Sequence, residues 1–240
     1  MKKIVGIFIV TLLIGTAMTT IAVNESNYNF SEPRGFTPVD VPASWLEGAD
    51  QYQTDDCRMA MYITSIWRMA QEFKPTKEDL TAIALYFMID DAPSDIDITV
   101  EIRESLNGSD LTSLTVNADD KKIKESGTWV MFDFDDITIT PEETYYIVCY
   151  ASGGLIDHGY CFFFDINNKY DRGIAYYSYD SGETWADLEH PNEPEYKEMD
   201  FCFITYYQPP PKNKIFNTTF LQFLENHPHM FRLLRQLLGL

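Results

Sequence analysis

The chain has 240 residues, which is long enough for one hydrophobic core with appended segments. Its 37 aspartates and glutamates outnumber its 18 lysines and arginines, so the formal net charge is -19. An acidic body without a basic patch repels phosphate backbones, and the composition therefore argues against a nucleic-acid partner.

Two segments precede the predicted domain. Residues 1–22 combine two lysines, an apolar run from Ile4 to Gly15 and a stretch of small residues. This is the pattern of a signal peptide cleaved after Ala22 or Ala17, with an uncleaved membrane anchor as the alternative. Residues 23–49 are polar and interrupted by proline and glycine, which predicts a flexible leader. We therefore expect a secreted, extracellular protein, and association with the cell surface stays open.

Residues 50–207 show short runs with period-two alternation, each bounded by turn residues. With no convincing helix between them, they predict an all-β protein, an antiparallel jelly-roll β-sandwich of about nine strands. Parallel α/β architecture is excluded, because its crossovers need helices. The predicted strands are residues 68–75, 80–88, 97–106, 111–118, 128–137, 144–152, 160–166, 173–180 and 200–207.

Two of these runs carry finer predictions. The alternation fails between Val100 and Ser105, which indicates a bulge near the end of that strand. In residues 128–137, Phe132 and Phe134 are expected to face the core, while Asp133 and Asp135 face water.

An oxidising compartment would allow the four cysteines to form disulfides. Residues 144–166 read as a hairpin with its turn near Leu155, which would place Cys149 opposite Cys161. Cys57 would then pair with Cys202. Buried thiols are the alternative, and the absence of a Cys-x-x-Cys motif makes a zinc site a weak hypothesis.

The chain ends in a Pro-rich linker, residues 208–214, and a tail, residues 215–240, with the spacing of two short amphipathic helices. Three interpretations of the tail stay open. It lies on a membrane surface, it is recognised by sorting machinery, or it packs on its own sandwich.

A resemblance covers about two-thirds of the chain. The segments "AQEFKPT", "LTAIALYF", "DITVEIRESLNGSDLTS", "WVMFDFDDITITPEETYYIV" and "DFCFITYY" resemble a jelly-roll module of secreted archaeal and bacterial surface proteins. Such modules are similar to carbohydrate-binding and galactose-binding-like domains. The resemblance implies the architecture, an accessory rather than catalytic role, and a ligand only loosely.

The segment "SYDSGETW", Ser178 to Trp185, resembles the Asp box of sialidase-type β-propellers. The motif implies that Ser178 and Asp180 bond turn amides, that Gly182 takes a positive φ, and that Trp185 packs beneath the hairpin. A sialidase would need several copies and an arginine cluster. We therefore predict a structural turn here.

Aromatic residues make up 15% of the chain, and a carbohydrate platform needs two or three exposed planar rings. We predict the ligand-binding set Tyr170, Tyr176, Tyr179 and Trp185, with core packing of these rings as the alternative.

A structural calcium ion is predicted at Asp165, Asn167 and Asp171, with the acidic turn at residues 90–97 as a second candidate. The alternative is that these acidic turns are simply solvated.

No catalytic motif is present, so we predict no enzymatic activity. The sequence favours a secreted binding or adhesion module at the cell surface, directed at a glycan. A structural or protein-binding component of the cell envelope is the alternative, and a glycoside hydrolase ranks third.

Overall fold

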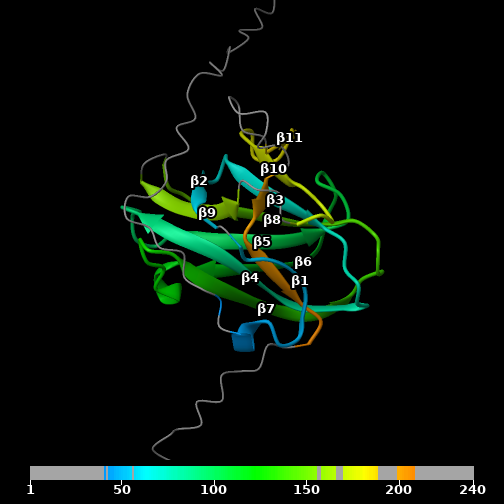
Figure 1. Cartoon of the computed structure of the whole chain (residues 1–240). Helices are drawn as coiled ribbons and strands as arrows, with labels where there is room; N and C mark the ends of the chain where they lie inside the picture. Colours follow the sequence, from blue (N-terminus) through cyan, green and yellow to red (C-terminus); the bar gives the residue numbers. More distant parts are fainter. Residues whose placement is uncertain are drawn as a thin grey trace, which may run out of the picture.

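The structure is a computed structural model, and it describes residues 41, 43–55, 57–155, 158–165, 170–188 and 199–208. Two antiparallel sheets pack face to face, which confirms the predicted all-β sandwich (Figure 1). The strands at Asp97–Arg103 and Thr128–Thr138 alternate in burial, as expected when one face of a strand contacts the core.

The first sheet has seven strands, with β4 (Asp79–Asp90) at its centre. Its order is β1-β13-β4-β9-β12, while β2 pairs with β9 and β7 pairs with β4. Its other members are β1 (Ala49–Gln53), β2 (Met59–Ile63), β7 (Thr128–Thr138), β9 (Gly159–Asp165), β12 (Asp200–Phe201) and β13 (Phe203–Tyr206).

The second sheet has six strands in the order β11-β10-β3-β8-β5-β6. They are β3 (Arg68–Phe73), β5 (Asp97–Arg103), β6 (Asp110–Asn117), β8 (Tyr145–Ala151), β10 (Ala175–Ser178) and β11 (Ala186–Asp187). Two short 3-10 helices, η1 (Ala43–Trp45) and η2 (Asp119–Lys121), complete the described elements.

Each of the nine predicted runs overlaps at least one strand of the structure. β1, β2 and β11 were not predicted, and the predicted domain start at residue 50 falls inside β1. The register of β5 on β6 shifts between Ile102 and Arg103, which confirms the predicted bulge. The alternation along β7 is confirmed too, since Phe132 and Phe134 are buried while Asp133 and Asp135 are exposed.

The main core lies between the sheets and is filled by alternate residues of facing strands. In the second sheet, Ile98, Val100 and Ile102 of β5 point inward, as do Ile147 and Cys149 of β8. The residues between them therefore point out of the sandwich, because successive side chains of a strand alternate between faces.

Part of the outer face of the seven-stranded sheet, over β4 and β13, is apolar and covered. Ala82, Ala84, Ile204 and Tyr206 form a second cluster, against which Val41, Trp45 and Leu46 pack. The segment around η1 thus covers this part of the face, although residues 23–49 were predicted to be a flexible leader.

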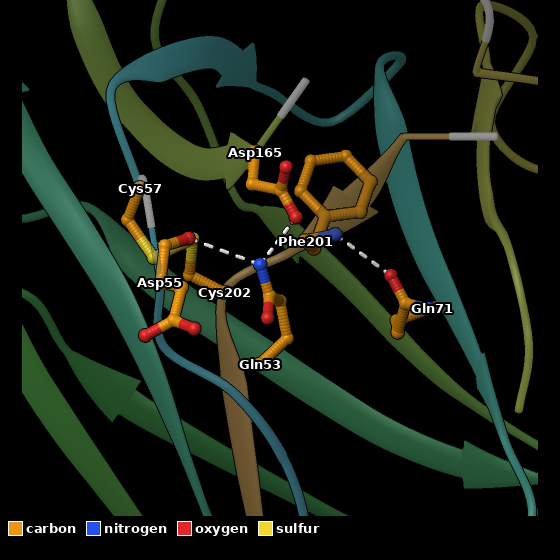
Figure 2. Close-up of a disulfide and its surroundings, with 7 residues drawn as sticks. All are labelled: Gln53, Asp55, Cys57, Gln71, Asp165, Phe201 and Cys202. Atoms are coloured by element: carbon orange, nitrogen blue, oxygen red, sulfur yellow. Dashed lines mark hydrogen bonds between the residues drawn. A yellow bond between two sulfur atoms is a disulfide. The ribbon is translucent and has the colours of Figure 1, made fainter. Parts of the chain in front are cut away.

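A disulfide lies where the chain leaves β9 and begins to pair with β4 in the first sheet. β12 pairs with β9 and β13 pairs with β4, so the chain from Asp200 to Tyr206 passes between these two strands. At the break, the Cys202 amide donates to the Phe163 carbonyl (2.9 Å) and the Cys202 carbonyl accepts from the Tyr86 amide (3.3 Å). Cys202 is bonded to Cys57, which confirms this predicted pair (Figure 2).

The predicted Cys149–Cys161 pair is wrong, and both residues are buried thiols that are not joined in a disulfide. The reason is topological. β8 belongs to the six-stranded sheet and β9 to the seven-stranded sheet, so the connection near Leu155 crosses between layers and is not a hairpin within one sheet. Burial, and secondly the charge of Glu101, raise the pKa of the Cys149 thiol well above its usual range.

The predicted signal peptide, the helical tail, and all of the linker except Gln208 lie outside the described residues. Within the described part of the chain, no helix has the length and apolar character needed to cross a membrane.

Candidate functional site

The outer face of the six-stranded sheet carries aromatic and charged side chains. Tyr146 and Tyr150 of β8 and Tyr176 of β10 point outward and are half-buried. We call these rings, with the outward side chains of Arg68, Glu72, Glu101 and Arg103, the tyrosine face.

Small residues under the rings explain how the tyrosine face is built. Ala70 pairs with Tyr176 on one side and with Val148 on the other, so both small residues point outward with the tyrosines. Both are nevertheless 0% exposed, which means that neighbouring outward side chains cover them. The rings of Tyr146 and Tyr176 meet edge to face, with centroids 5.9 Å apart.

Two of the three phenol groups donate hydrogen bonds to carboxylates. The Tyr150 hydroxyl donates to Glu101 (2.9 Å), and the Tyr176 hydroxyl donates to Glu72 (3.2 Å). Arg103 donates to the other oxygen of Glu101 (2.5 Å), which fixes that carboxylate in turn. The pKa of each of the three tyrosines is raised, and partial burial is the main cause. The three phenols are therefore neutral at physiological pH. These bonds hold the rings in set orientations.

The β10–β11 turn borders this surface. The Ser178 hydroxyl accepts from the Gly182 amide (2.8 Å), and Asp180 accepts from the Thr184 amide (2.9 Å) and hydroxyl (2.5 Å). Gly182 has φ +87°, and a Cβ there would lie 3.4 Å from the Trp185 ring. The side-chain bonds and the glycine conformation expected of this segment are therefore present.

The predicted ligand-binding residues occupy different environments. Tyr176 belongs to the tyrosine face. The Tyr179 ring meets those of Trp67 (centroids 4.8 Å apart) and Tyr177 (4.6 Å) at tilted angles, and these two side chains pack on the main core. Trp185 is half-buried at the turn. The four residues therefore do not form a single platform.

The prediction for Tyr170 is wrong. Only 5% of this residue is exposed, its ring packs edge-on against Phe203, and its hydroxyl donates to Gln51 (3.2 Å). Burial raises the pKa of its phenol far above the usual range. Tyr170 thus fills the core, which was the alternative considered for these rings.

The calcium prediction gains no geometric support from the described residues. Asp165 is fully buried and accepts a hydrogen bond from the Gln53 amide (Figure 2). Asp171, in contrast, is exposed on a turn. Asn167 lies outside the described residues. Where the chain is described, no group of three histidine, cysteine or acidic side chains is arranged to hold a metal ion.

In the second acidic turn, Asp90 accepts from Tyr62, and Asp91 faces His158 at 3.5 Å. The Asn117 amide donates to both Asp97 (3.2 Å) and Asp95 (3.4 Å). These contacts engage the carboxylates with protein groups.

Tyr146 and Tyr150 were missed by the sequence analysis. They occur in "YYIVCYA", where residues of both faces are apolar or aromatic, so the inward and outward sets do not separate by hydrophobicity. The signal that would have found them is their spacing of four residues, which places both on the face opposite to Ile147 and Cys149.

The comparisons with known proteins do not add a family. No protein-family model matches this sequence, and no curated protein is significantly similar to it.

Proposed function

We propose that the protein is a secreted, non-catalytic binding module at the cell surface, and that it binds a glycan through the tyrosine face. The observation that carries the proposal is the contrast between the two outer surfaces. Part of one surface, over β4 and β13, is apolar and covered by the segment around η1, while the other presents three half-buried tyrosines among charged side chains.

The chemistry of the tyrosine face suits a sugar. The C–H faces of a pyranose ring stack on aromatic side chains, and its hydroxyls need donors and acceptors beside them. Here the rings of Tyr150 and Tyr176 stand next to the carboxylates of Glu101 and Glu72. The anchored phenols lose little further side-chain freedom on binding, which favours affinity.

The finer fold in this proposal is a jelly roll. Its support is the alternation of consecutive strands between layers. β3 lies in the six-stranded sheet, β4 in the seven-stranded sheet, β5 and β6 return to the six-stranded sheet, and β7, β8 and β9 alternate again. The resemblance to secreted carbohydrate-binding sandwiches rests on the same strands.

Export is supported by two features. The N-terminal residues have the composition of a signal peptide, and Cys57 and Cys202 form the kind of disulfide that persists outside the cytosol. In this proposal the Asp-box-like segment is a structural turn that holds the edge of the tyrosine face.

Affinity electrophoresis through gels that contain single polysaccharides tests the proposal. The full chain is expected to be retarded by at least one polysaccharide. Tyr150→Ala and Tyr176→Ala should each weaken retention by about threefold to tenfold, since one aromatic contact contributes about 0.5–1.5 kcal/mol. Tyr176→Phe keeps the ring and should bind nearly as wild type.

Tyr52→Ala is the matched control, because Tyr52 is a half-exposed tyrosine on β1 of the other sheet and should not affect retention. Thermal midpoints of all variants report whether the fold is intact. Retention on no polysaccharide would refute glycan binding, and capture of an envelope protein instead would favour the protein-binding alternative. Release of reducing sugar that Glu72→Gln abolishes would contradict the non-catalytic assignment.

A further inference from the structure

Arg68 occupies a distinctive place on the tyrosine face. It begins β3, and its guanidinium lies over the Tyr150 ring, 4.1 Å from the centroid. On its other side is the β10–β11 turn, where a Cβ at Gly182 would lie 3.4 Å from the Arg68 Cδ and 3.7 Å from its Nη1. The Arg68 side chain therefore lies between a ring and a turn.

This guanidinium has no acidic partner among the described residues. Arg103 pairs with Glu101 and Arg172 pairs with Glu142, whereas Arg68 makes neither an ion pair nor a hydrogen bond there, and its buried Nε also lacks an acceptor. Three acidic groups of the tyrosine face and its turn already have partners: Glu72 bonds Tyr176, Glu101 bonds Tyr150 and Arg103, and Asp180 bonds Ser178 and Thr184. A charge placed in this way is available to a ligand.

We propose that Arg68 binds the oxyanion of an acidic glycan, either a uronate carboxylate or a sulfate ester, at the end of the tyrosine face. A guanidinium presents parallel N–H donors whose spacing matches the oxygens of such a group, and charge-assisted bonds of this kind are stronger than neutral ones. Stacking on Tyr150 orients these donors before a ligand arrives. The inference rests on the proposed function and adds the class of glycan to it.

The net charge of the whole molecule affects how an acidic glycan can bind. A formal net charge of -19 repels polyanions at a distance, and at about 0.15 M salt this repulsion is screened beyond about 8 Å. The net charge of the protein therefore does not attract an acidic polysaccharide. A preference for the acidic form of a polysaccharide would have to come from a local contact.

Two matched pairs of polysaccharides test this inference at 0.15 M salt: polygalacturonate against its methyl-esterified form, and dextran sulfate against dextran. We expect wild-type protein to bind one acidic member at least about tenfold more tightly than its neutral counterpart. The first pair reports a carboxylate and the second a sulfate.

Arg68→Met keeps most of the aliphatic stem and should remove this preference, so that the variant binds the acidic and the neutral member of each pair equally. Arg68→Lys keeps the charge without the fork and should retain only part of the preference. Lys122→Met removes the same charge from an exposed turn and should leave the preference intact.

The outcomes separate the two proposals. Equal binding of acidic and neutral members, or an acidic preference that Arg68→Met leaves unchanged, would overturn the role of Arg68 and leave glycan binding in place. An equal loss in Lys122→Met would also overturn it, because the effect would then be one of total charge. If no polysaccharide binds at all, the proposed function itself fails.

Discussion

At the scale of single residues, Asp180 shows how one side chain closes the β10–β11 turn. Its carboxylate accepts from the Thr184 amide and hydroxyl and from the Ser178 hydroxyl, and these bonds lower its pKa from the usual 3.8 to about 2. Because these bonds favour the charged form, the stability they contribute is fully present above about pH 4. It is lost as the pH falls toward 2.

This gives a prediction for Asp180→Asn. The variant should be less stable than wild type at pH 7, because it loses an ionised acceptor in the turn. The difference should shrink between about pH 4 and pH 2, as wild type becomes protonated. Denaturant titrations of both proteins across this range measure it. A difference that stays constant down to pH 2 would show that the carboxylate charge is not what holds the turn.

Gly182 sets the backbone of the same turn. At φ +87° any residue with a Cβ is strained, and the added atom would also contact Arg68 and Trp185 at 3.4 Å. Gly182→Ala is therefore expected to cost about 1–2 kcal/mol of unfolding free energy. Gly153→Ala is the control, because its added Cβ would meet nothing closer than 3.8 Å. Equal midpoints for the two variants in thermal unfolding would argue against strain at Gly182.

At the scale of elements, the junction of β4, β9 and β12–β13 depends on the Cys57–Cys202 bond. The bond closes a loop with a sequence separation of 145 residues, so in the chain-entropy model it stabilises the fold by about 5 kcal/mol. Measured losses on removal are commonly about 2–5 kcal/mol. We expect the double variant Cys57→Ala, Cys202→Ala to lose stability in this range.

Reduction provides the internal control for this prediction. Dithiothreitol should lower the unfolding midpoint of the wild type to that of the double variant and should leave the double variant unchanged. If dithiothreitol lowered the unfolding midpoints of both proteins equally, the group sensitive to reduction would lie elsewhere in the chain.

The segment around η1 is the second element with a testable role. Trp45 packs on the apolar cluster that includes Ala84, Ile204 and Tyr206. Trp45→Ala should cost about 2–3 kcal/mol and increase the binding of a hydrophobic dye, because it uncovers part of that cluster. Ile66→Ala is the matched control, since Ile66 is already 53% exposed and should change neither quantity. Dye binding that rises equally in both variants would contradict this role for η1.

At the scale of the whole molecule, the sequence predicted the layers better than the surface. Alternation along runs such as the one containing Phe132 and Phe134 identifies strands and a sandwich, because period two is a local property. The failed Cys149–Cys161 pair marks the limit of such reasoning. The same pattern fits a hairpin and a crossing between sheets, and only the pairing of distant strands decides between them.

The candidate site shows the same limit. Tyr176 was predicted because it lies in a dense aromatic run, and so was Tyr170, which the fold buries. Arg68, Glu72 and Glu101 come from β3 and β5, which are separated in sequence and meet β8 from opposite sides. Their grouping arises from strand order, and no local motif encodes it.

We expect the outer face of the six-stranded sheet, and not the outer face of the seven-stranded sheet, to contact a glycan. The most direct test is NMR of the full chain with ring-labelled tyrosines, titrated with fragments of the polysaccharide that retards it most. We predict saturable shifts of Tyr146, Tyr150 and Tyr176, with Tyr52, Tyr86 and Tyr206 unchanged. Shifts confined to Tyr52, Tyr86 or Tyr206 would contradict the account.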